Sequence, residues 1–360
     1  MPKLDFTKLT PTNHAITSLR DLLKMTVFQD EKLEDILTFV GNIVNGQRLG
    51  FIGAMEDVGE KGVGCEPVYK TNKIDASEKQ WELGDWDIPL KICYEDLEGT
   101  IAEYTLKAGT EIGDLTSGEY MDYIVLPALE EAMKKMLWRI AWYGDKNANN
   151  ITAGEGGTSG VITDGVDTKL FTMADGFWKR LFAIATANPG QKTSISANTA
   201  ASYAAQKSGL FTKGVATKLF DDIRMNADGR IESLPGAAIF CTKSLADALA
   251  WDAKQSYNSI MPWEVLFDGL KVSEWDGTKI ISVSLWDRFN KKYQDNGTIV
   301  NLPHRAVYTS PDNLLLGYPG NDAISDLDIW FDRKERVNYI YSTGKIGTLI
   351  KEDDLVHVAY

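Results

Sequence analysis

Residues Gly118 to Gly165 read GEYMDYIVLPALEEAMKKMLWRIAWYGDKNANNITAGEGGTSGVITDG, and they reveal more about the architecture than any other part of the chain. Apolar residues recur every three to four positions in the first half, which gives a helix one buried stripe. These residues are Met121, Val125, Leu129, Met133, Met136 or Leu137, and Ile140. The pattern predicts a long amphipathic helix at about 118–143, followed by a Gly/Asn-rich turn. Nothing in it is typical of a catalytic site.

Pro127 lies inside this predicted helix. Proline has no N–H to donate to the carbonyl four residues back, so Pro127 is expected to kink the helix or to mark its true start. In either case a stiff rod of roughly 25–35 Å remains, at about 1.5 Å per residue. The pairs Glu130 with Lys134 and Glu131 with Lys135 support the helix and imply no function.

Length and composition narrow the class of protein. With 360 residues, the chain exceeds one average core, so sub-domains or one elaborated fold are expected. It has no run of eighteen apolar residues and no signal-peptide pattern at its start, which predicts a soluble protein made in the cytoplasm. Cys65, Cys93 and Cys241 are too few and too scattered for a disulfide framework or a zinc knuckle.

The net charge of −13 argues against sequence-specific binding of nucleic acid, which usually requires clustered lysine and arginine. Ten tryptophans indicate large buried contacts, either in the core or at subunit interfaces. The core is the default explanation for them.

Ahead of the long helix, the sequence predicts a helix at about 33–44 and then a long β-hairpin between about 51 and 90. Glycine turns and alternating apolar residues support the hairpin, and Trp81 and Trp86 lie on its second half. A two-stranded ribbon is marginally stable in water, so this hairpin needs another surface to lie on.

Beyond the long helix, the pattern predicts an α/β unit. Helices are expected at 175–187, 210–225 and 243–254, with a short apolar strand at 236–242. A surface loop or ribbon is expected at 190–208, short strands separated by Asp-Gly and Asn-Gly turns at 266–316, and closing strands at 327–331 and 337–350.

Chemical motifs are weak throughout. His14, His304 and His357 are far apart and close to no acid or cysteine pair at ligand spacing. The glycine-rich segments lack the Lys-Ser/Thr of a phosphate-binding loop, and the segment that begins at Asp145 lacks the glycine and glutamate of a calcium loop. We therefore expect no catalytic residues, no metal and no cofactor.

The order of these parts resembles the major capsid protein of tailed double-stranded DNA bacteriophages. AWYGDKNANN with GGTSGVITDG, YTSPDNLLLG at 308–317 and the C-terminal WFDRKERVNYIYSTGKIG resemble elements of that family. The resemblance implies an α+β fold of the HK97-like (Hong Kong 97) type. It implies an N-terminal arm at 1–50, an E-loop hairpin at 51–93, a P-domain at 94–165 and 322–360 with a spine helix at about 118–143, and an A-domain at 166–321.

The same resemblance implies hexamers and pentamers that form an icosahedral head around double-stranded DNA, bound without sequence specificity. Scaffolding, portal and decoration proteins would be partners, and the protein would reside in the virion after assembly in the host cytoplasm. Some relatives join an E-loop lysine to a neighbour's asparagine, and Lys70, Lys73 and Lys79 lie on the predicted hairpin. Trp81 and Trp86 are expected at inter-subunit contacts.

Three other interpretations stay open. An encapsulin-like compartment would have the same fold and would enclose enzymes instead of DNA. A soluble enzyme or carbohydrate-active protein would show a concave aromatic pocket. Another virion structural protein, such as a tail protein, would form rings or tubes.

Overall fold

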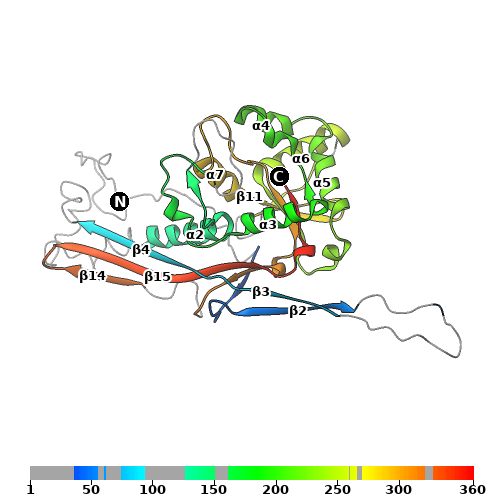
Figure 1. Ribbon diagram of the computed structural model, residues 1–360. Helices are drawn as coiled ribbons and strands as arrows, with labels where there is room; N and C mark the ends of the chain where they lie inside the picture. Colours follow the sequence, from blue (N-terminus) through cyan, green and yellow to red (C-terminus); the bar gives the residue numbers. More distant parts are fainter. Residues whose placement is uncertain are drawn as a thin grey trace, which may run out of the picture.

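The computed structural model describes residues 36–55, 61, 74–93, 126–150, 161–258, 260–265, 270–320 and 327–360. Figure 1 shows a compact α/β unit, a long narrow sheet that runs beneath α2, and a two-stranded hairpin that projects beyond the body. The predicted mixture of helices and strands is confirmed. The sequence at 94–108 also predicts a short helix, but this segment lies outside the described residues.

The α/β unit is built on a seven-stranded sheet in the order β7-β16-β12-β8-β11-β10-β9. The bounds are β7 Lys192–Thr193, β16 His357–Ala359, β12 Ala306–Thr309, β8 Ala238–Thr242, β11 Thr278–Val283, β10 Lys271–Trp275 and β9 Glu264–Val265. The central strand β8 is buried along its whole length, as the apolar run GAAIFCT predicts. It pairs parallel with β11 and antiparallel with β12.

Five helices surround this sheet: α3 Phe177–Ala187, α4 Tyr203–Leu210, α5 Val215–Asn226, α6 Lys243–Tyr257 and α7 Ser284–Tyr293. Short 3-10 turns connect the elements: η5 Thr168–Leu170, η6 Pro189–Gln191, η7 Ser196–Thr199, η8 Gly229–Ser233, η9 Pro311–Asn313 and η10 Asp353–Leu355. The predictions of α3, α5 and α6 are confirmed. The loop expected at 190–208 is partly wrong, because Ser202 accepts from the N–H of Ala205 and begins α4.

The long helix α2 spans Leu126–Tyr143, so the helix expected from the apolar stripe is confirmed for its described part. Leu129, Met133, Met136 and Ile140 are buried along one face. In the described helix, Pro127 lies in the first turn. Backbone N–H groups in a first turn have no carbonyl partner within the helix, so the N–H that proline lacks costs no helical hydrogen bond. A small sheet of β5 Asn149–Asn150 and β6 Val161–Ile162 follows the helix.

The narrow sheet contains β1 Thr38–Val40, β13 Leu314–Gly317, β15 Val337–Ile350, β14 Asp328–Asp332 and β4 Gly84–Cys93. Residues Gly347–Ile350 of β15 pair with β13, and residues Val337–Tyr341 lie between β4 and β14. We call the β4, β15 and β14 portion the sheet arm. Both strands expected at 327–331 and 337–350 are confirmed.

Two predictions for the N-terminal region are corrected. The helix expected at 33–44 is wrong for the described residues, because Thr38–Val40 forms β1 and pairs parallel with β13. The strand pairing expected for the second half of the hairpin is also wrong, because β4 pairs with β15 over ten positions from Gly84 to Cys93. In both places a distant strand supplies hydrogen bonds that local periodicity does not reveal.

A third correction concerns residues 284–293, which were expected among short strands and form α7. The helical signal is present in the sequence, since Leu285, Trp286, Phe289 and Tyr293 are buried on one face. The turn residues on either side obscured it. The Asp-Gly turn at 276–277 is confirmed between β10 and β11, with positive φ at both residues.

Aromatic side chains from α2, α3 and α7 meet in one cluster, which we call the aromatic hub. The Trp142 ring lies 4.5 Å from that of Trp286 and 5.4 Å from that of Trp178, measured between centroids. All three side chains are at most 2% exposed. Edge-on and tilted contacts of this kind add to the energy of area burial, so the hub fastens α2 to the α/β unit.

Arg305 is buried against this hub, and its guanidinium carbon lies 5.5 Å from the ring centres of Tyr143, Trp178 and Phe182. Its Nε donates to the carbonyl of Leu302 at 2.7 Å. Burial lowers the pKa of Arg305 to about 10. Carbonyl acceptors and aromatic faces thus hold this cation in the core.

Candidate functional site

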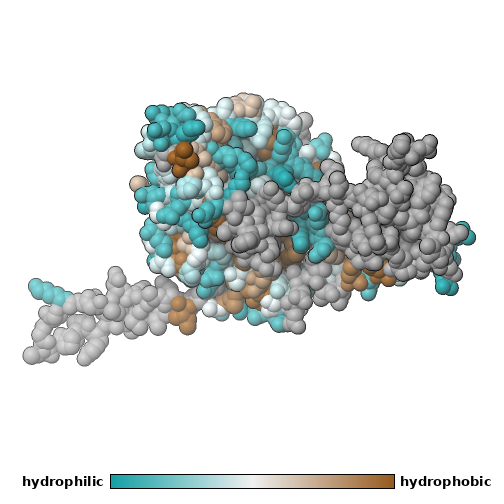
Figure 2. All heavy atoms as spheres, turned by 180° about the vertical axis from the view of Figure 1, so that it is seen from behind, coloured by the Kyte–Doolittle hydropathy of each residue, from teal (hydrophilic) through white to brown (hydrophobic). Residues whose placement is uncertain are grey.

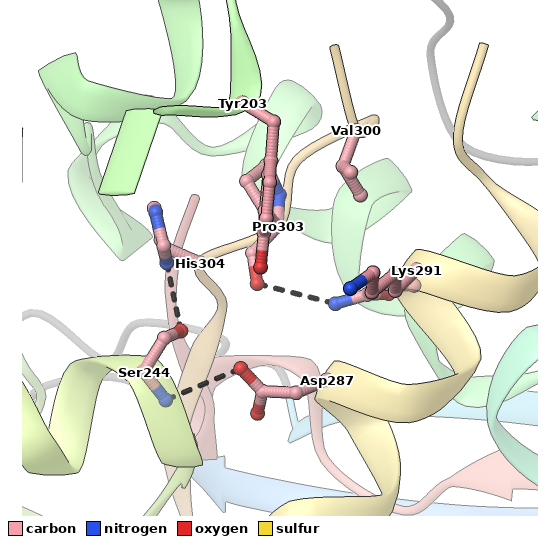
Figure 3. Close-up of a pocket in the computed structure, with 8 residues that line it drawn as sticks. Tyr203, Ser244, Asp287, Lys291, Val300, Pro303 and His304 are labelled. Carbon is pink, nitrogen blue, oxygen red and sulfur yellow. Dashed lines mark hydrogen bonds between the residues drawn. The ribbon is translucent and has the colours of Figure 1, made fainter. Parts of the chain in front are cut away.

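A small polar pocket lies between α6, α7 and the segment before β12, and it is the first place to test for catalysis (Figure 3). Ser244, Asp287 and His304 all line it. Ser244 Oγ lies 2.8 Å from His304 Nδ1, and Asp287 Oδ1 accepts from the backbone N–H of Ser244 at 3.2 Å. A serine, a histidine and an aspartate in contact invite comparison with a nucleophilic triad.

The hydrogen bonds assign these residues a structural role. Asp287 accepts from the backbone N–H groups of Lys243, at 2.6 Å, and Ser244, so it caps the start of α6 and does not orient the imidazole. The Nε2 of His304 faces the carbonyl of Gln206 at 3.2 Å. Since a carbonyl can only accept, Nε2 carries the proton and Nδ1 accepts from Ser244.

The protonation states also disfavour catalysis at this pocket. Burial lowers the pKa of His304 to about 4, which makes it a poor base near neutral pH. Burial raises the pKa of Asp287 to about 6, although its backbone donors oppose that shift. The pocket also has room for only about one water molecule. It is a polar junction between α6 and α7.

Two further observations concern metal ligands and membrane-spanning helices in the described part of the chain. Among the residues that the structure describes, no group of three His, Cys, Asp or Glu side chains converges as a metal site would. Among the helices that the structure describes, none is both long and apolar enough to cross a membrane.

The projecting hairpin has a different character. Strand β2, Arg48–Met55, pairs antiparallel with β3, Ile74–Gln80, and the register is irregular between Ile52 and Met55. Within the described part of the chain, neither strand pairs with a third. Ile52 is 83% exposed, and nearby Val44 is 70% exposed. In the described structure the hairpin thus leaves its strand edges unpaired and the apolar side chain of Ile52 open to solvent.

Trp81 and Trp86, expected at inter-subunit contacts, have side chains buried within this chain. Trp81 is 1% exposed and Trp86 is 2% exposed. Each covers a glycine on a neighbouring strand: a Cβ on Gly317 would lie 2.5 Å from the Trp81 ring, and a Cβ on Gly344 would lie 2.5 Å from the Trp86 ring. Both rings pack inside the subunit, where they leave almost no surface for a neighbour.

The three lysines proposed for the hairpin fall into two groups. Lys70 and Lys73 lie outside the described residues. Lys79 is described, and its Nζ donates to Asp353 at 2.6 Å and to the carbonyl of Ile350 at 2.8 Å. A cross-link to a neighbour stays a prediction for all three, and at Lys79 it would have to displace these internal partners.

The exposed face of the sheet arm carries aromatic side chains that the sequence analysis did not single out. Trp330 on β14 is 45% exposed and stacks on Tyr339 of β15, with centroids 5.4 Å apart. Tyr341 is 38% exposed on the same face of β15. Period-two alternation in VNYIYSTGKIG would have placed Tyr339 and Tyr341 on one face.

No family model matches this sequence, and no curated protein shows significant similarity to it. Similarity does appear among solved structures. A structure from Gordonia phage Cozz has 12% sequence identity and a TM-score of 0.50, with 98% of this chain and 91% of that chain covered. A structure from Microbacterium phage Oxtober96 has 11% identity and a TM-score of 0.50, with 99% and 98% covered.

A third similar structure is the SrpI encapsulin complex from Synechococcus elongatus PCC 7942. It has 10% identity and a TM-score of 0.50, with 95% of this chain and 91% of that chain covered. This chain has the HK97-type fold. The likeness extends over nearly the whole length of each protein, so it includes the extended parts as well as the compact unit.

Within the HK97-type fold, the resemblance equates β2–β3 with the E-loop and α2 with the spine helix. The division into N-terminal arm, E-loop, P-domain and A-domain at the boundaries given above stays a prediction. At identities of 10–12% the likeness establishes the fold alone. Function must be argued from the surfaces of this chain.

Proposed function

We propose that this chain is the structural subunit of a phage head and that it assembles into hexamers and pentamers of an icosahedral shell. The projecting hairpin is the observation that carries the proposal. Its two strands have no third strand beside them in the described structure, and Ile52 is 83% exposed. Since a two-stranded ribbon is marginal alone, a neighbouring subunit is the natural support.

The shape of the subunit favours repeated contact between copies. The hairpin and the sheet arm extend toward opposite ends of the molecule (Figure 1). Seen from behind, apolar side chains gather along the lower edge near the base of the hairpin, below a mainly hydrophilic α/β unit (Figure 2). Contact between different surfaces on successive copies generates closed rings when the rotation permits. Hexamers and pentamers are such rings.

Double-stranded DNA is the content that we propose for the shell. The net charge of −13 suits a wall that repels DNA weakly and lets it move during packaging and release. Binding would have no sequence specificity. Scaffolding, portal and decoration proteins are the expected partners, with assembly in the host cytoplasm and final residence in the virion.

An encapsulin-like compartment is the second candidate, because an encapsulin complex matches this chain at the same TM-score as the phage structures. The two functions predict the same subunit and different contents. A phage head contains nucleic acid, whereas a compartment contains protein cargo.

Negative-stain electron microscopy with size-exclusion chromatography tests the proposal on the full chain, expressed with and without neighbouring genes that supply a scaffold. Closed shells, or hexamers and pentamers, are expected. The nucleic-acid content of shells purified from the native source then separates a phage head from a compartment. A persistent 40 kDa monomer in the presence of a scaffold would refute both.

A further inference from the structure

The hairpin joins the body through a buried pivot at Trp81. Its ring packs with Ile43, Leu83 and Leu349 in a small apolar cluster that is separate from the main core. Its backbone N–H donates to the carbonyl of Gln47 at 2.9 Å, and its carbonyl accepts from Gly46 at 3.0 Å. The ring lies directly against Gly317, where an added Cβ would come within 2.5 Å of it. Trp81 therefore fixes where the hairpin begins.

Two ion pairs flank this pivot. On one side, Lys79 of β3 reaches Asp353 at 2.6 Å and the carbonyl of Ile350 at the end of β15. On the other side, Glu82 pairs with Lys146 at 2.8 Å. Lys146 lies shortly after the end of α2 at Tyr143, so this second pair links the base of the hairpin to the segment that follows the long helix.

Lys146 is itself held in place. Its backbone N–H donates to Asp175 Oδ1 at 2.9 Å, and Lys179 joins Asp175 to Asp145 with N···O distances of 2.7 Å. The hydrogen bond from Lys146 also lowers the pKa of Glu82 below its usual range. One side of each ion pair is thus anchored in the body, while the other side belongs to the hairpin or its connection.

We infer that the ion pairs Lys79–Asp353 and Lys146–Glu82 are latches that set the direction of the hairpin about the Trp81 pivot. Both pairs are partly exposed, with side-chain exposures of 24–56%, so salt weakens them. Strand β3 is about 23 Å long, so a rotation of about 10° at the pivot moves its far end by about 4 Å. The two ion pairs at the base of the hairpin therefore control a displacement of several ångströms at the far end of β3.

The direction of the hairpin is a property of the subunit and holds whatever the shell contains. Its consequence rests on the proposed function, because a neighbour must meet the hairpin at one angle for rings to close. Opening the latches is then expected to broaden the range of assembled sizes. The direct test measures the angle, so its failure is distinct from a failure of the proposed function.

The test places spin labels at Ile52→Cys on β2 and Lys218→Cys on α5, in the full chain with Cys65 and Cys93 replaced by serine. Cys241 is buried and can stay. Labelled chain is diluted with an excess of unlabelled chain, and the distance between labels is measured by pulsed electron resonance. The variant Lys79→Met/Lys146→Met opens both latches.

A matched control removes two other ion pairs and the same amount of charge. Arg48→Met/Lys345→Met breaks Arg48–Glu78 within the hairpin and Lys345–Asp85 on the sheet arm. We expect the latch variant to broaden the distance distribution and shift its mean by several ångströms, as high salt does for the parent protein. An unchanged distribution, or equal broadening in the control, would overturn the inference.

Discussion

The strands of the α/β unit and the strands of the hairpin differ in their hydrogen-bonded neighbours and in their burial. Strand β8 has partners on both sides and is fully buried, whereas β2 and β3 have only each other in the described structure. Phe240 on β8 is 0% exposed, and Ile52 on β2 is 83% exposed. The first region holds most of the buried contacts, and the second region leaves strand edges unpaired in the described structure, which is the surface that the proposed assembly would use.

The polar pocket beside α6 lies in the tightly packed region. The polar groups of the pocket beside α6 bond to one another, and Asp287 is committed to a helix cap. Surface that remains available lies on the hairpin and on the aromatic face of the sheet arm. A shell subunit needs such a division, because its fold must survive before any neighbour is present.

The largest effect on stability is expected at the aromatic hub. Trp142→Ala removes a fully buried ring that contacts Trp178 and Trp286, and we expect a loss of about 3–5 kcal/mol in the free energy of unfolding. Chemical denaturation of the unassembled chain measures it. The exposed Trp330→Ala serves as the control and should lose less than about 0.5 kcal/mol. Equal losses from both would break the comparison.

Acid should destabilise the α/β unit through His357. Burial lowers its pKa from 6.5 to about 4, so the folded state favours the neutral ring. Its contribution is therefore complete above pH 6.5 and is lost as the pH falls to about 4, by up to about 3 kcal/mol. The free energy of unfolding, measured across this pH range, should fall more steeply with decreasing pH in the parent than in His357→Gln.

Two other buried groups act in the same pH range. His304 has the same sign as His357, because burial also lowers its pKa to about 4. Asp287 has the opposite sign, since its raised pKa of about 6 favours the folded state at low pH. Parallel pH profiles for the parent and His357→Gln would contradict the role given to His357.

Gly344→Ala tests the cross-strand packing of β15 against Trp86 of β4 within the sheet arm. The new Cβ would lie 2.5 Å from the Trp86 ring, and we expect a loss of about 1–3 kcal/mol. Trp86→Leu in the same chain should recover part of this loss, because the smaller side chain makes room. Thermal unfolding of the three variants and the parent measures the coupling. Strict additivity would show that the two positions do not interact.

The smallest effect on stability and the clearest effect on assembly are expected at Ile52. Ile52→Ser changes an exposed side chain, so the unfolding free energy should shift by less than about 0.5 kcal/mol. The yield of rings and shells should fall, because an apolar contact with the neighbour is lost. Size-exclusion chromatography at matched concentration compares it with Lys218→Ser on α5. If Ile52→Ser assembled as fully as the parent, the proposal that the hairpin contacts a neighbour through Ile52 would be wrong.

Much of the architecture was predictable where one stretch of sequence carries its own pattern. The stripe of α2, the apolar run of β8, the Asp-Gly turn at 276–277 and the alternation of β15 depend on side chains only a few residues apart. These patterns, with the resemblance of their order, were enough to predict the α+β class and the HK97-type fold. The helix α7 also carried its own pattern and was missed beside stronger turn signals.

Only the tertiary structure decided the positions that depend on distant partners. Thr38–Val40 became a strand because β13 lies beside it, and β4 left the hairpin because β15 offers ten paired positions. Trp81 and Trp86 became internal because Gly317 and Gly344, more than 200 residues away in sequence, leave space for their rings. By itself the sequence determined the elements whose pattern lies within one segment, such as the apolar stripe of α2 and the apolar run of β8, since those patterns follow from neighbouring residues. Which faces are covered depends on contacts between remote segments, and the fold alone supplies those.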